Sequence, residues 1–66
     1  MITTVYTINA QTNTVDEWLC TGEMTAKYNG KMERLCFLQK ERKSLALPKR
    51  CVFETKDAAL AVLNHN

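Results

Sequence analysis

The side chains best suited to chemistry in this 66-residue chain are three thiols and one imidazole. If the fold brought them together, Cys20, Cys36, Cys51 and His65 would form a Cys3His zinc site. Structural zinc sites usually contain two ligands separated by only two to four residues, and no two of these cysteines are that close. The sequence therefore predicts no metal site, and it predicts unbridged thiols that pack as small apolar groups.

Catalytic constellations are also missing from the pattern. Nucleophilic catalysis needs a hydroxyl or thiol beside a base, but the single histidine, His65, lies near an end expected to fray, and the single serine, Ser44, lies in a charged turn. The carboxylates alternate with basic residues or fall in expected turns, where water keeps them ionised. Gly22 and Gly30 are too few for a glycine-rich phosphate loop. We therefore expect a protein that is not an enzyme and needs no cofactor.

Charge is distributed unevenly. Residues 27–50 contain eight basic and two acidic side chains, a local charge of +6, whereas the whole chain has a net charge of only +2. If this basic segment shared one face it could contact several phosphates, and an aromatic ring at a hairpin tip could stack on a base. The candidate contacts are Lys27, Tyr28, Lys31, Arg34, Lys40, Arg42, Lys43, Lys49 and Arg50.

A structural role explains the same residues without a ligand, because lysines at turns and sheet edges prevent edge-to-edge pairing. Nucleic-acid-binding domains typically have a pI above about 9, and the pI of this chain is lower, about 8.5. Within "QKERKSLALPKR" (residues 39–50) we expect a solvated basic turn followed by a short strand. Its Leu45 and Leu47 share a face by the two-residue period of a strand, and we expect both in the core.

Two hairpins are expected first along the chain. A polar turn at residues 11–14 separates two strand-like segments, and centring it on residues 12–13 pairs Tyr6 with Leu19. Asn29-Gly30 is a strong signal for a type I′ turn, which pairs Met24 with Leu35. Gly22 is expected at a bulge between the hairpins.

The rest of the chain completes an α+β fold. Residues 45–47 and 51–54 are short strand candidates, and residues 56–64 form an amphipathic helix that Thr55 caps. We expect a single compact domain, residues 1–66, in which a small curled antiparallel sheet of four or five strands forms a meander or an SH3-like partial barrel. One short C-terminal helix covers part of it.

Function follows only in outline from these features. The chain has no apolar run long enough to cross a membrane, no signal-peptide pattern and an odd number of cysteines, so we expect a cytoplasmic location and no membrane partner. Apolar residues fall on both faces of the expected sheet, which leaves Val5, Trp18 or Phe37 for another protein or a second copy of the chain. We therefore predict a protein-interaction module, with nucleic-acid binding as the alternative.

Overall fold

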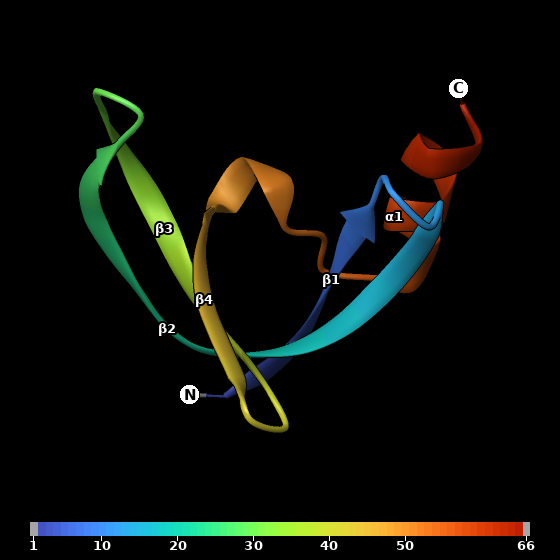
Figure 1. Cartoon of the computed structure of the whole chain (residues 1–66), viewed down its shortest axis with the longest axis horizontal. Helices are drawn as coiled ribbons and strands as arrows, with labels where there is room; N and C mark the ends of the chain where they lie inside the picture. Colours follow the sequence, from blue (N-terminus) through green and yellow to red (C-terminus); the bar gives the residue numbers. More distant parts are fainter. Residues whose placement is uncertain (1, 66) are drawn as a thin grey trace.

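The computed structural model describes residues 2–65, which form one antiparallel sheet, a short 3-10 helix and one α-helix (Figure 1). The elements are β1 (Thr3–Asn9), β2 (Thr14–Tyr28), β3 (Lys31–Lys40), β4 (Lys43–Pro48), η1 (Lys49–Cys51) and α1 (Lys56–Asn64). The strands lie in the sheet in chain order, with β1 and β4 at the edges. The sheet is open rather than a closed barrel, and the predicted α+β meander with one C-terminal helix is confirmed.

The second hairpin follows the sequence prediction. Asn29 and Gly30 have φ values of 53° and 84°, as a type I′ turn requires, and Met24 lies opposite Leu35. The register of β2 against β3 shifts between Cys20 and Gly22, which confirms the bulge. Because a bulge increases the local bend and twist, β2 continues as one curved strand through both hairpins (Figure 1).

The first hairpin has a different register from the predicted one. Tyr6 lies opposite Glu17 rather than Leu19. The Asn9 side chain accepts hydrogen bonds from two backbone amides of the turn, at 3.0 and 3.3 Å, and Asn13 adopts a φ of 58°. These features make a longer loop than the two-residue turn we assumed. The residue of β2 opposite each residue of β1 differs from the predicted one by two positions. Because side chains alternate with a period of two, every residue still lies on its predicted face.

One face of the sheet, here called the core face, carries the buried cluster. Its members are Val5, Trp18, Cys20, Cys36 and Leu38, with Leu47 and Val52 packed against them. The prediction that Val5 and Trp18 contact a partner is wrong, because each is only 8% exposed. The two residues pair across β1 and β2, and the indole Nε1 of Trp18 donates a 2.9 Å hydrogen bond to Thr7 Oγ1. This bond satisfies the one polar group that burial of the ring would otherwise leave unpaired.

The leucines of β4 share the core face as predicted, but they are not equally buried. Leu47 lies opposite Cys36 and packs against the core cluster. Leu45 lies opposite the fully buried Leu38, yet it remains 37% exposed, so the prediction that both leucines are buried is wrong for Leu45. The physical reason is position: β4 is an edge strand, and residues 2–65 place no further strand beside it.

The chain after β4 is less regular than predicted. Residues 49–51 form η1, and the strand expected at 51–54 is reduced to a single bridge in which Phe53 and Tyr6 exchange backbone hydrogen bonds of 2.9 and 2.8 Å. In Figure 1, η1 lies between the two arms of the curved sheet.

Helix α1 begins where predicted, because Thr55 Oγ1 accepts a 3.1 Å hydrogen bond from the Ala58 amide. The helix packs on β1 and β2, where Val62 and Leu63 line a shallow hollow together with Ile8. Ile8 alternates with Val5 and Thr7 along β1, so the helix lies over the side of the first hairpin away from the core cluster. No helix within residues 2–65 has the length and hydropathy to cross a bilayer.

Candidate functional site

Three exposed apolar side chains lie on the sheet face opposite to the core cluster. Leu19, Met24 and Phe37 are 45%, 46% and 37% exposed. Phe37 lies opposite Gly22, and Met24 follows Gly22 by two residues, so Phe37 and Met24 share one face of the sheet. Leu19 lies on the other side of the bulge, and the register shift there places it on the same face. We call these three residues the apolar strip. Phe37 was the one predicted interface residue that the structure leaves at the surface.

The apolar strip is built around the bulge. A methyl group added at Gly22 would lie 3.8 Å from Cδ2 of Phe37, so the ring packs closely over the glycine backbone. Beside it, Met24, Leu35 and Pro48 form one row across three strands, and the last two are buried. The strip is therefore the exposed part of a larger apolar surface.

The basic segment does not form a single patch. Lys27, Tyr28 and Lys31 lie near the tip of the β2–β3 hairpin, and Tyr28 is half-buried opposite Lys31. Arg42 lies in the β3–β4 turn, and Lys43 pairs with Lys40 beside it. These two groups occupy opposite ends of β3, a strand of ten residues that spans about 30 Å.

The remaining basic side chains are engaged with carboxylates. Arg34 and Lys49 contact Glu23 at 2.8 and 3.5 Å, and Arg50 contacts Glu33 at 2.8 Å. Hydrogen bonding from Arg34 lowers the pKa of Glu23, and hydrogen bonding from Arg50 lowers the pKa of Glu33. Both carboxylates therefore stay ionised at neutral pH, which is the opposite of what a general acid requires.

Lys40 also makes an intramolecular contact rather than presenting a free charge. Its Nζ lies 5.4 Å from the ring centroid of Trp18 and 3.9 Å from a carboxylate oxygen of Asp16. A cation over an indole face shields the edge of the core from water while its charge stays solvated. This placement fits the structural role expected for the lysines of residues 39–50.

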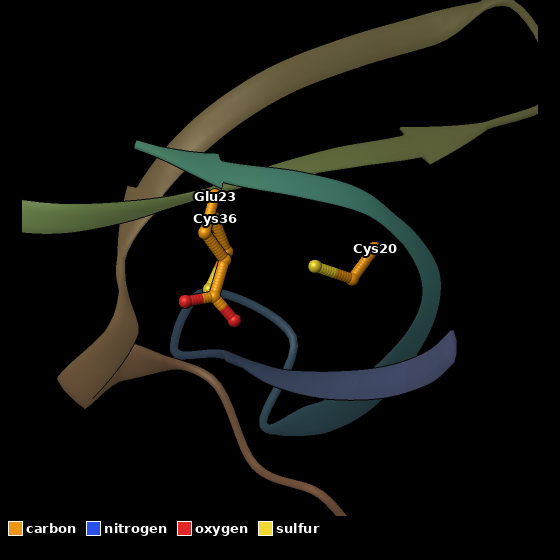
Figure 2. A group of neighbouring side chains, drawn as sticks. All are labelled: Cys20, Glu23 and Cys36. Carbon is orange, nitrogen blue, oxygen red and sulfur yellow. The ribbon is translucent and has the colours of Figure 1, made fainter. Parts of the chain in front are cut away.

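A compact group of potential metal ligands lies on the core face. The sulfurs of Cys20 and Cys36 and a carboxylate oxygen of Glu23 all lie within 4.8 Å of one another. Figure 2 shows Cys20 directing its sulfur toward Glu23 and Cys36, which come from adjacent strands. Of the four residues that the sequence offers for a zinc site, the structure brings together two, while Cys51 and His65 do not belong to this group.

Burial sets the chemistry of the thiols in this group. Cys36 is 2% exposed, and burial, followed by the neighbouring Cys20 and Glu23, raises the pKa of its thiol. Without a cation, Cys36 is therefore protonated and unreactive at neutral pH. Sequence reasoning missed Glu23 as a neighbour of the thiols because only the bulge turns it toward them.

Comparison with known proteins found no matching family model, no significantly similar curated protein and no significantly similar solved structure.

Proposed function

We propose that the chain is a non-enzymatic protein-interaction module that binds a partner protein through the apolar strip. The observation that carries the proposal is the exposure of Leu19, Met24 and Phe37 together on one sheet face. Exposed apolar side chains that adjoin each other on a rigid sheet are typical of binding surfaces, whereas scattered ones are not. The odd number of cysteines supports a cytoplasmic location for the module.

Two features make this surface suitable for a partner. It is pre-formed, because the strip lies on paired strands and its side chains need little ordering on binding. It also adjoins β4, whose outer edge carries no neighbouring strand among the described residues, so a partner segment added there would extend the same face. Pro48, which cannot donate a ladder hydrogen bond, limits such pairing at the end of β4.

The distribution of charge favours this proposal over nucleic-acid binding. Arg34, Lys40, Lys49 and Arg50 already have acidic partners. The other basic side chains are divided between the two ends of β3. Phosphate binding by this surface would therefore be weak and strongly salt-dependent.

The test compares two methionines on opposite faces. Met24 belongs to the apolar strip, and Met32 is 64% exposed on the core-face side of the β2–β3 hairpin tip, so Met24→Asp and Met32→Asp are matched variants. Both are examined by circular dichroism, by light scattering over a concentration series and by capture of proteins from nuclease-treated lysate.

We expect wild type and Met32→Asp to retain the same nuclease-resistant partner, or to self-associate to the same degree, and Met24→Asp to lose this binding while remaining folded. Equal binding by Met24→Asp and wild type would refute the proposed surface. Recovery of nucleic acid alone from untreated lysate would favour the alternative function.

A further inference from the structure

The bulge in β2 creates a ligand spacing that is absent from a regular strand. Residues three apart in an unbroken strand point to opposite faces, so Cys20 and Glu23 would normally be separated by the sheet. The register shift between Cys20 and Gly22 reverses the alternation and brings Glu23 to the core face, directly opposite Cys36. The result is a Cys-x2-Glu pair, with the same close spacing as the ligand pairs of structural zinc sites.

We propose that Cys20, Glu23 and Cys36 form a binding site for a thiophilic divalent cation such as Zn²⁺, held by two sulfurs and one carboxylate oxygen. In a tetrahedral zinc site neighbouring ligand atoms are about 3.5 to 3.8 Å apart, as the metal–ligand lengths require. The three ligand atoms here lie within 4.8 Å of one another, so a movement of about 1 Å brings them to that geometry.

The surroundings of Glu23 hold one oxygen and leave the other available. Arg34 Nε and Lys49 Nζ both contact Oε1, at 2.8 and 3.5 Å. The shortest contact of each of these two cations is with Oε1, and no side-chain hydrogen bond formed within residues 2–65 reaches Oε2. Arg34 and Lys49 thus orient the carboxylate as outer-shell partners orient metal ligands.

The charges at the site also favour occupation. Binding of the cation replaces the two thiol protons, which are released to solvent, while Glu23 is already ionised. Two thiolates and one carboxylate carry three negative charges, which the divalent ion and the adjacent Arg34 and Lys49 more than balance. Two sulfur ligands select zinc-like ions over Mg²⁺ and Ca²⁺, which prefer sites made of oxygen.

Three protein ligands leave the fourth position of a tetrahedral ion open to water or to a ligand from outside the chain. The bound ion would link β2 on both sides of the bulge to β3. It would therefore stabilise the point at which the sheet bends, directly behind the apolar strip.

The test uses the full chain, reduced with a phosphine and stripped of metal, and Co²⁺ as a spectroscopic probe. Thiolate coordination produces a near-ultraviolet charge-transfer band on Co²⁺, and stoichiometric Zn²⁺ removes it. The variants are Cys20→Ser, Cys36→Ser and Glu23→Gln, and Cys51→Ser is the matched control because Cys51 lies outside the ligand group. Circular dichroism monitors the fold of each.

We expect one Co²⁺ per chain in wild type and in Cys51→Ser, loss of the charge-transfer band in Cys20→Ser and Cys36→Ser, and affinity at least tenfold weaker in Glu23→Gln. The Glu23 variant keeps the test decisive if a buried cysteine variant fails to fold, because the Glu23 side chain is at the surface. Absence of the band in wild type, its loss in Cys51→Ser, or unchanged affinity in Glu23→Gln would overturn the proposal.

Discussion

Replacement of Leu38, in β3, by alanine should destabilise the fold more than the same replacement of a leucine in β4. Leu38 is 1% exposed and lies between Cys20 and Leu45 in the middle of the core face. Truncating a fully buried leucine removes its transfer free energy and leaves a cavity, which together cost about 3 to 5 kcal/mol. A domain of this size has a total stability of only about 3 to 10 kcal/mol. Leu38→Ala therefore removes about 30% of it or more.

Leu45→Ala is the matched control, because Leu45 is the cross-strand partner of Leu38 and has the same side chain. With 37% of its surface exposed, truncation opens no closed cavity, so we expect a loss of only about 1 kcal/mol. The assay is urea unfolding followed by circular dichroism and by the fluorescence of Trp18, the single tryptophan. With a slope of about 1 kcal/mol per molar urea, Leu38→Ala lowers the midpoint by about 3 to 5 M, or the variant is unfolded in water. Equal losses for the two leucines, or a loss below about 1 kcal/mol for Leu38→Ala, would show that the core is not centred where we place it.

Three further outcomes are expected. Thr7→Val removes the acceptor of the Trp18 indole and should lower stability by about 1 to 3 kcal/mol in urea unfolding; an unchanged midpoint would contradict that hydrogen bond. Gly30→Ala should lower the free energy of unfolding by about 1 kcal/mol or more, and with it the melting temperature, because Gly30 has a φ of 84°. Gly22→Ala makes only an ordinary 3.8 Å contact and should have a smaller effect. The reverse order of the two variants would refute the assigned turn. In metal-free protein the free energy of unfolding should fall as the pH rises above the ordinary thiol pKa of 9.0. Burial raises the pKa of Cys36 in the folded state, so above this pH the folded chain keeps a thiol proton that the unfolded chain has lost. Cys36→Ala should flatten this part of the pH profile, and an identical profile would mean that Cys36 is not responsible.

Local signals in the sequence determined the elements whose causes are themselves local. Asn29-Gly30 sets the turn of the second hairpin because both residues tolerate a positive φ, and the register of β2 against β3 follows from it. Thr55 caps α1 through its own hydroxyl, so the start of the helix was predictable as well. Gly22 correctly marked the bulge, although its effect on side-chain direction was not foreseen.

The first hairpin shows where local signals were insufficient. Its turn contains no glycine, and the loop depends on hydrogen bonds to the Asn9 side chain together with a left-handed Asn13. Several loop lengths suit such a polar cluster, and its sequence does not select among them.

Only the tertiary structure decided which face of the sheet becomes the core. Alternation in the sequence grouped Val5 with Trp18 correctly, but both faces contained enough apolar residues to be buried. Val52 packs against the core cluster because the preceding η1 lies between the two arms of the curved sheet (Figure 1). This arrangement depends on the bend in β2. The same bend turns Glu23 toward the two buried thiols and leaves Phe37 at the surface. A strand period assigns residues to two faces, but burial of one of them depends on contacts between segments far apart in the chain, and no local pattern encodes those contacts.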